Sequence, residues 1–356
     1  MVSRLRVLFF VTAALGGALL AAVAEPAAST VTFNKDVAPI LFSQCATCHR
    51  PGGSAGSTLL TFDDARRRAR QIAAVTASRT MPPWKPEPGF GEFAGNRRLT
   101  DRQIETFQRW VDGGLVEGAR ADLPRQPEWP SGWELGTPDL VLTMPEYTLR
   151  AGGPDMFRNF VIHVPTGVSR FVRAWQFRPG NRVVHHATMQ IDTDGTSRRY
   201  DDQDAESGYE GLIAPSARAP DGFFLDWAPG HQAAVAVPNT AWPLPKDSDL
   251  VMMLHLRPSG KVERVQASIG LYFSDSPPAQ LPVMLRLTRQ NLDIPAGQSA
   301  YRVTDSFTLP IDVDVYTVQP HAHYLAHEMR GTARLPDGTI RPLILIKQWD
   351  FDWQDV

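Results

Sequence analysis

The stretch Cys45-Ala46-Thr47-Cys48-His49 decides how the first third of this sequence is interpreted. The spacing C-x-x-C-H is the attachment pattern of c-type haem, in which two thiols bond the haem and the histidine ligates the iron. A redox dithiol would need a thioredoxin-like context, and a zinc site would need a second Cys/His pair at ligand spacing. Neither is found nearby, so the motif predicts a covalent haem c held by Cys45, Cys48 and His49.

Helical patterns flank this motif. Apolar residues at helical spacing predict a helix over 34–42, directly before it. Thr61 and Thr100 each begin a capping-box pattern, and these predict helices over 62–78 and 101–111. The first part of the chain is therefore expected to be all-α.

Met81 lies between the last two predicted helices and precedes two prolines and Trp84. A residue before proline disfavours helix, so Met81 is predicted on a stiff loop. It either packs on Trp84 or joins His49 as the second axial ligand of the haem iron, a pair that raises the reduction potential. Residues 31–118 resemble a class I cytochrome c domain, which has C-x-x-C-H near its start and a methionine loop before its last helix.

The first 24 residues have the pattern of a secretory signal peptide. Arg4 and Arg6 precede an apolar run over 7–21, and the small-x-small pattern A-V-A ends at Ala24. The alternative is an uncleaved membrane anchor, for which the run is short. We therefore expect a periplasmic or secreted protein, a location that suits a haem attached outside the cytoplasm.

The composition excludes several classes of protein. The 356 residues are 43% hydrophobic and 21% charged with a net charge of −2, which is globular rather than disordered or coiled-coil. A near-neutral balance gives no reason to expect a nucleic acid or an acidic membrane surface as partner. Both cysteines belong to the haem motif, so no disulfide is expected. The chain has nine histidines, and its metal chemistry must come mostly from them.

The second part of the chain has a different pattern. Residues 119–138 are rich in Pro, Trp and Gly and are predicted to form a linker packed by its tryptophans. Short alternating runs then predict an all-β sandwich or jelly-roll region. Residues 195–222 are polar and aperiodic, which predicts one long surface loop. The predicted strands are 139–143, 159–164, 171–177, 183–191, 250–256, 268–273, 283–287, 306–309 and 313–318.

Five histidines of this part fall into three groups, namely His185-His186, His255 and His321-x-His323. Residues i and i+2 of a strand face the same side, so His321 and His323 can share an ion. Adjacent residues face opposite sides. His185 and His186 can therefore share an ion with His255 only if the strand is bulged or ends there, or if different ring nitrogens bind. Imidazole without thiolate fits copper, zinc, non-haem iron or nickel.

Other histidines are interpreted differently. His163 and His231 are expected to be structural. His323 and His327 have the i, i+4 spacing of a helical zinc pair, but the H-E-x-x-H motif is absent.

From about residue 138 onward, the order His-His, lone His, H-x-H resembles the copper type II, ascorbate-dependent monooxygenases. That family includes peptidylglycine α-hydroxylating and dopamine β-monooxygenases. The chain is also similar to bacterial members in which a cytochrome c domain with a Met-Pro-Pro-Trp loop precedes the copper domains. The resemblance implies two jelly rolls with one copper each, the first over 139–280 and the second over 281–356.

The resemblance also implies roles for these histidines. His185, His186 and His255 would hold an electron-transfer copper. His321 and His323 would hold part of the catalytic copper, where O2 is used to hydroxylate a C–H bond of a small organic substrate. Electrons would come from a periplasmic donor through the haem.

One departure from the family pattern concerns the second copper. Its methionine ligand lies well downstream of the H-x-H in the family, and Met329 is too close to His323 to match it. The sequence also stops 33 residues after His323, so we expect an incomplete second jelly roll. Either the sequence is a fragment, or the protein lacks the third ligand of the second copper. Two alternatives follow. The protein is a non-catalytic electron-transfer or copper-binding protein, or a cytochrome whose β part only docks a partner.

Overall fold

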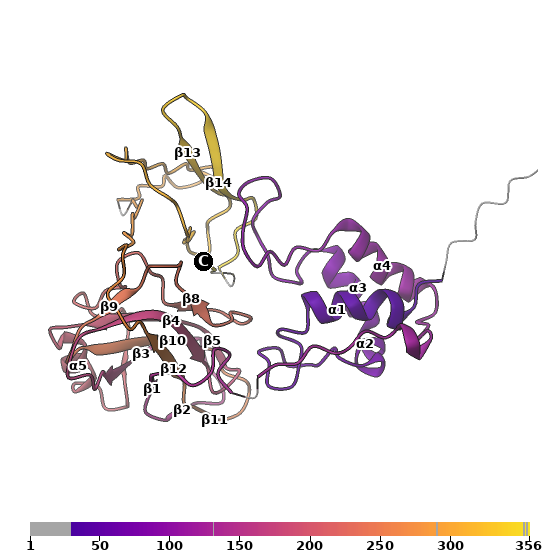
Figure 1. Ribbon diagram of the computed structural model, residues 1–356, viewed down its shortest axis with the longest axis horizontal. Helices are drawn as coiled ribbons and strands as arrows, with labels where there is room; N and C mark the ends of the chain where they lie inside the picture. Colours follow the sequence, from indigo (N-terminus) through magenta and orange to yellow (C-terminus); the bar gives the residue numbers. More distant parts are fainter. Residues whose placement is uncertain (1–29, 131, 290, 352, 354) are drawn as a thin grey trace, which may run out of the picture.

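The computed structural model describes residues 30–356 except 131, 290, 352 and 354. The predicted signal peptide, residues 1–24, lies outside the described residues. Figure 1 shows a helical part, a larger part made of β-sheets, and a β-hairpin above the sheets. None of the helices in the described part of the chain has the length and apolar character needed to cross a bilayer.

Most helices precede residue 125, as the sequence predicts. Thr61 begins one helix by accepting a hydrogen bond from the Asp64 amide at 3.1 Å, and Thr100 forms a full capping box with Gln103. Phe33, Phe107 and Trp110 lie in the buried core of this part. The helices are η1 (Phe33–Val37, π), α1 (Ala38–Gln44), α2 (Phe62–Arg67), α3 (Ala69–Ala77), α4 (Asp101–Asp112), η2 (Arg120–Asp122, 3₁₀) and α5 (Thr196–Asp201).

The helix predicted over 62–78 is two helices. The Arg68 amide bonds the Ala65 carbonyl three residues earlier at 3.0 Å, and the backbone of Arg68 leaves the helical region. This tight turn separates α2 from α3.

The strands confirm the mostly β character predicted for the second part. The first six predicted runs correspond to β1, β3, β4, β5, β10 and β12. The strands are β1 (Leu140–Thr143), β2 (Tyr147–Leu149), β3 (Met156–His163), β4 (Arg170–Arg178), β5 (Val184–Asp192), β6 (Tyr209–Glu210), β7 (Asp226–Trp227), β8 (Ala234–Val235), β9 (Trp242–Leu244), β10 (Asp249–Leu256), β11 (Glu263–Val265), β12 (Ser268–Phe273), β13 (Met329–Arg334) and β14 (Ile340–Ile346).

Two antiparallel sheets make up most of the β part. One has the order β1-β12-β4-β8, with β9 also paired to β4, and the other has the order β6-β3-β10-β5-β7. Side chains from both sheets share one buried core, which includes Trp175 and Ile269 from the first and Phe160, Met189 and Leu254 from the second. This arrangement is compatible with the predicted sandwich.

The linker is packed at its tryptophans. The Arg50 guanidinium of the helical part lies 4.9 Å from the Trp129 ring centroid. The Arg178 guanidinium of β4 lies 4.1 Å from the Trp133 ring centroid. Each tryptophan therefore holds the linker against one of the two parts it joins.

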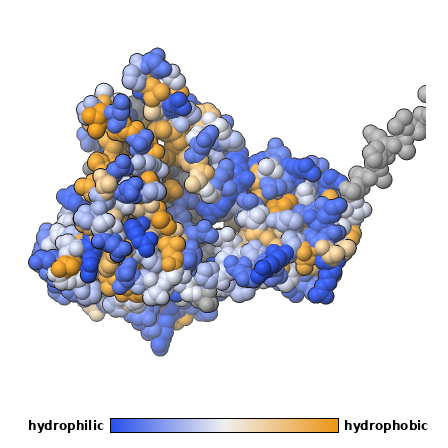
Figure 2. Space-filling model, in the orientation of Figure 1, coloured by the Kyte–Doolittle hydropathy of each residue, from blue (hydrophilic) through white to orange (hydrophobic). Residues whose placement is uncertain are grey.

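Three predicted strands, 283–287, 306–309 and 313–318, are absent from the described structure. These residues are not paired with another strand, and alternation alone cannot supply the hydrogen bonds that make a sheet. Val283 is 83% exposed. Figure 2 shows apolar residues gathered on the part of the molecule above the sandwich, where this segment runs.

Residues 195–222 are not simply the surface loop that their polarity predicts. The segment contains α5 and β6, and Ser197 and Tyr209 are buried. The Arg158 guanidinium of β3 donates to the carbonyls of Ser207 at 2.7 Å and Gly208 at 2.8 Å. Such long-range anchors leave no trace in local periodicity.

The hairpin β13–β14 has a small core of its own. Ile344 and Ile346 are buried with Trp353, and Met329 packs against them. Phe93, from the loop that precedes α4, also packs against this cluster. The hairpin therefore contacts the helical part as well as its own chain neighbours.

Candidate metal centre

A β-bulge brings His185, His186 and His255 together. His255 of β10 pairs with His186 of β5, but the next residue, Leu256, pairs with Val184. His185 is therefore the extra residue of a bulge. In a regular strand His185 and His186 would face opposite sides. The bulge satisfies one of the conditions under which the sequence allows these three histidines to share an ion.

The three imidazoles meet through the same ring atom. The Nδ1 atom of His186 lies 3.2 Å from Nδ1 of His185 and 3.2 Å from Nδ1 of His255. The candidate ligand atoms all lie within 4.8 Å of one another. In the part of the chain that the structure describes, no other three or more His, Cys, Asp or Glu side chains form such a group.

Hydrogen bonds among the three rings cannot satisfy all of their Nδ1 atoms. The Nε2 atom of His255 lies 2.7 Å from a carboxylate oxygen of Asp155. A carboxylate only accepts, so Nε2 carries the proton and Nδ1 of the neutral ring keeps its lone pair. His186 has one Nδ1 proton at most for its two Nδ1 contacts. A cation that accepts the three lone pairs removes this conflict, and the histidine set fits copper, zinc, non-haem iron or nickel.

Electrostatics keeps His186 in the form that binds metal. Burial, together with the charges of His255 and His185, lowers the pKa of His186 from its ordinary 6.5 to about 3. A neutral imidazole is the form that ligates a metal ion. His255 is fully buried, and the Phe157 ring stacks on it with a centroid distance of 4.3 Å and an interplanar angle of 15°.

Asp155 is a site residue that sequence reasoning missed. Its carboxylate accepts from His255 and, at 3.0 Å, from the Arg257 guanidinium. Burial is the largest single influence on the pKa of Asp155 and raises it, but the hydrogen bonds and charges of Arg257 and His255 together outweigh burial and lower it. Asp155 directly precedes β3, in which Met156 pairs with Leu256. Only this strand register places the carboxylate beside the histidines, so no local signal could have found it.

His321 and His323 lie beside the three-histidine cluster. Their ring centroids are 5.3 Å apart, although the segment is not a strand. Phe351 lies between the two sets, with its ring 5.4 Å from that of His323 and 6.3 Å from that of His186. The charge of His321 also contributes to the lowered pKa of His186.

The His321/His323 pair is not part of a three-residue His, Cys, Asp or Glu group among the residues that the structure describes. Met329, the methionine that sequence reasoning left unassigned, packs in the apolar cluster of the hairpin with Ile344 and Trp353.

The C-x-x-C-H residues have the chemistry that haem attachment needs. Cys45 and Cys48 are free thiols, and burial together with Cys48 raises the pKa of Cys45 to about 12. His49 Nδ1 lies 3.1 Å from the carbonyl of Ser57. A carbonyl only accepts, so this bond places the proton on Nδ1 and leaves Nε2 as the free ligand atom. The residues therefore fit a covalent haem.

Met81 is 41% exposed on its predicted loop. It lines a small pocket with Thr76, Trp84 and Leu99, and His49 does not line that pocket. The contact with Trp84 that the sequence allowed and the ligand role are thus both compatible with its place, and the axial role stays a prediction.

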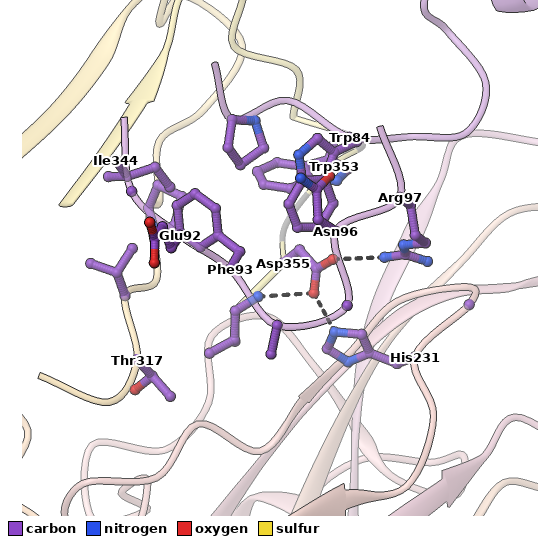
Figure 3. Close-up of a pocket in the computed structure, with 18 of the residues that line it drawn as sticks. Trp84, Glu92, Phe93, Asn96, Arg97, His231, Thr317, Ile344, Trp353 and Asp355 are labelled. Atoms are coloured by element: carbon purple, nitrogen blue, oxygen red, sulfur yellow. Dashed lines mark hydrogen bonds and ion pairs between the residues drawn. The ribbon is translucent and has the colours of Figure 1, made fainter. Parts of the chain in front are cut away.

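A larger pocket of about 620 Å³ lies where the helical part, the sandwich and the C-terminal segment meet. Its lining includes Thr47 of the haem motif and Trp84. Figure 3 shows Asp355 at its centre, between Arg97 and His231. The Arg97 guanidinium donates to Asp355 at 3.0 Å, and His231 Nε2 bonds the other carboxylate oxygen.

The two histidines expected to be structural occupy different surroundings. The side chain of His163 is 55% exposed at the end of β3, with Nδ1 3.5 Å from a carboxylate oxygen of Asp249. His231 is held on both ring nitrogens, by Asp355 and by the carbonyl of Asp226 at 3.2 Å.

Comparison with known proteins leaves the site to be interpreted from its own chemistry. No protein-family model matches the chain, and no curated protein is significantly similar to it. The donors themselves are three convergent imidazoles on a bulged strand pair, a neighbouring histidine pair and a C-x-x-C-H segment.

Proposed function

We propose that this chain is an exported haem- and copper-binding oxidoreductase of the copper type II monooxygenase kind. It would hydroxylate a C–H bond of a small organic substrate with O2 and receive electrons through a fused cytochrome c-like domain. The observation that carries the proposal is the convergence of the three Nδ1 atoms of His185, His186 and His255. The helical part and the sandwich would correspond to the cytochrome c domain and the first jelly roll of the resembling proteins.

The residues of the centre have distinct tasks in this proposal. When bound, copper supplies one-electron chemistry by cycling between Cu(I) and Cu(II). Asp155 fixes the ring orientation of His255 and accepts the hydrogen bond from the proton at Nε2, which leaves a lone pair on Nδ1. Burial keeps His186 neutral. His321 and His323 would contribute to the second, substrate-oxidising copper, and their closeness to His186 suits transfer between two sites.

The haem-attachment residues have a separate task. Cys45 and Cys48 would hold the haem covalently, and His49 would ligate its iron through Nε2, which the Ser57 carbonyl leaves free. Met81 would be the second axial ligand. A bound haem c supplies reversible one-electron transfer at the iron.

Copper reconstitution tests the three-histidine centre first. Haem-loaded protein is titrated with Cu(II), and bound copper is counted by metal analysis and examined by electron paramagnetic resonance. His185→Ala and His255→Ala are expected to lose the copper that three nitrogens ligate. His163→Ala, an exposed histidine of the same sheet, is expected to keep it. If the haem iron is the only metal found and no copper is bound, the partner-docking alternative is favoured instead.

Oxygen chemistry then tests the activity. The haem- and copper-loaded protein is reduced without oxygen, oxygen is admitted, and the haem spectrum is followed. Faster haem reoxidation in the presence of copper is expected, and a rate indifferent to copper contradicts the proposed relay.

A second candidate function is a non-catalytic electron-transfer or copper-binding protein. The observation that favours it is that the described residues complete a three-ligand group only at His185, His186 and His255. Oxygen consumption with a C–H substrate separates the two candidates. Copper-dependent haem reoxidation without product formation would support the second.

A further inference from the structure

We propose that the turn Pro229–Gly230–His231 couples the haem-attachment segment electronically to the three-histidine centre. The inference rests on the proposed function, which places haem and copper on one chain. It concerns this chain's own residues that connect Cys48 to His186, among them His231, to which the sequence analysis gave only a structural role.

The first contact of this route joins Cys48 to the backbone of Gly230. A Cβ atom built on Gly230 would lie 2.8 Å from Cys48 Sγ and 2.7 Å from an Arg97 guanidinium nitrogen. Real Cβ atoms do not approach so closely, and φ at Gly230 is +98°, a value that favours glycine. The thiol that would carry the haem therefore rests directly on the backbone of the sandwich part.

The second link is the His231 ring. Its Nδ1 lies 3.2 Å from the Asp226 carbonyl, and its Nε2 contacts the Asp355 carboxylate. Both partners only accept hydrogen bonds, so both ring nitrogens carry protons and the ring is fixed in one orientation. Arg97 holds the same carboxylate from the helical part. The turn is thus tied to Asp226 on one side and to the helical part on the other.

The third link is the pairing of β7 with β5. Asp226 pairs with Thr188 and Trp227 with Ala187, and the Thr188 hydroxyl donates to the Asp226 carboxylate at 2.6 Å. Ala187 directly follows His186. The route from Cys48 to His186 therefore contains one van der Waals contact, one side-chain hydrogen bond and one strand pairing.

Such a route suits electron transfer. Covalent and hydrogen bonds couple a donor and an acceptor more strongly than the same length of empty space or water. With haem and copper bound, one electron would pass from Fe(II) to Cu(II), which would give Fe(III) and Cu(I). No bond forms or breaks and no proton moves, and an external one-electron reductant supplies the haem.

A single-turnover measurement tests the route. In the haem- and copper-loaded full chain, without oxygen or substrate, a photochemical one-electron reductant reduces the haem. Haem absorbance and the Cu(II) resonance signal are then followed. His231→Phe and Gly230→Ala are expected to slow haem reoxidation by about tenfold or more. The substitutions change the coupling between the two centres and not the difference between their reduction potentials. The reduction potentials of both centres are measured in each variant and are expected to stay unchanged.

Control variants separate the route from the packing around it. Asp355→Asn weakens the contact to the helical part but keeps the bond from His231 to Asp226, so its rate is expected to stay near that of the unmodified chain. His163→Phe is expected to have no effect. In the metal- and haem-free chain, hydrogen exchange at the Asp226 and Trp227 amides is expected to rise in His231→Phe and to stay unchanged in His163→Phe.

The outcomes are distinguishable. If the unmodified chain shows no copper-dependent haem reoxidation, the proposed function fails and the route fails with it. If the unmodified chain relays electrons and His231→Phe or Gly230→Ala relays them equally fast, the route alone is overturned. It is also overturned if Asp355→Asn slows transfer as much as His231→Phe.

Discussion

At the scale of the residue, His255 shows how surrounding contacts hold an imidazole in a form that could ligate a metal ion. Its ring is fully buried, stacks on Phe157 and donates to Asp155. The stacking and the hydrogen bond restrict the orientation of the imidazole, and its Nδ1 lies 3.2 Å from Nδ1 of His186. The residue type could be identified from the sequence because histidines in groups are unusual. Its supporting residues could not, because Asp and Phe are common and carry no metal signal.

Asp155→Asn is expected to weaken copper binding at the three-histidine centre by roughly 10- to 100-fold, the usual effect of losing such a supporting partner. The neutral amide stabilises the ring of His255 less and no longer demands its proton at Nε2. Affinity is measured by competition with a copper chelator. Glu146→Gln is the matched control, because Glu146 forms an exposed ion pair with Arg264 at 3.2 Å. Equal affinities in the two variants would contradict the role given to Asp155.

At the scale of the element, the local sequence predicts a secondary-structure element well when the hydrogen bonds of its backbone are made within the element. Helix α4 is such a case: its capping box, Thr100 with Gln103, is readable from four residues. Strands depend on a partner instead. The run over 313–318 alternates more clearly than the nearly continuous apolar run of β10, yet only β10 has neighbours on both sides, β3 and β5. The sequence pattern therefore identified a strand-like segment in both cases and a sheet in only one.

Thr100→Ala is expected to destabilise the helical part by about 1 kcal/mol, because the Gln103 amide loses its acceptor at the helix start. Thr106→Ala is the control within the same helix, since its hydroxyl only bonds the Arg102 carbonyl. Both are measured by chemical unfolding followed by helical circular dichroism. A Thr100→Ala loss no larger than that of the control would show that the cap contributes little here.

At the scale of the whole molecule, a charged cluster joins the three parts. Arg97 comes from the helical part, His231 from the sandwich and Asp355 from the C-terminal segment (Figure 3). Burial alone lowers the pKa of His231, but the hydrogen bond to Asp355 and its charge outweigh burial and raise it above the ordinary 6.5. Arg97 opposes this rise and the Asp226 carbonyl supports it. The charged groups facing the ring are thus Asp355, Arg97 and the Asp226 carboxylate.

A raised folded-state pKa makes this cluster sensitive to pH. The stabilisation is fully present below pH 6.5 and is lost as the pH rises through the raised pKa of His231. The thermal midpoint of the metal-free chain is therefore expected to fall over that range. His231→Gln is expected to cost about 2 kcal/mol below pH 6.5, the scale of a hydrogen bond to a charged group. His231→Gln is also expected to flatten the dependence of the thermal midpoint on pH.

His163→Gln provides the comparison, because His163 is half exposed and lies outside the cluster. It is expected to keep the pH slope of the unmodified chain. A slope that His231→Gln leaves unchanged would show that another group controls the pH dependence.

The sequence by itself determined those features that depend only on residues close together along the chain. The haem-attachment pattern, the helix caps, the alternation of the paired strands and the grouping of the histidines are all local. The tertiary structure alone decided the bulge at His185, the Asp155 contact, the place of Phe351 between two histidine sets, and the meeting of Cys48 with Gly230. These depend on strand register and on contacts between residues far apart in the chain, where a shift of one residue turns a side chain to the other face.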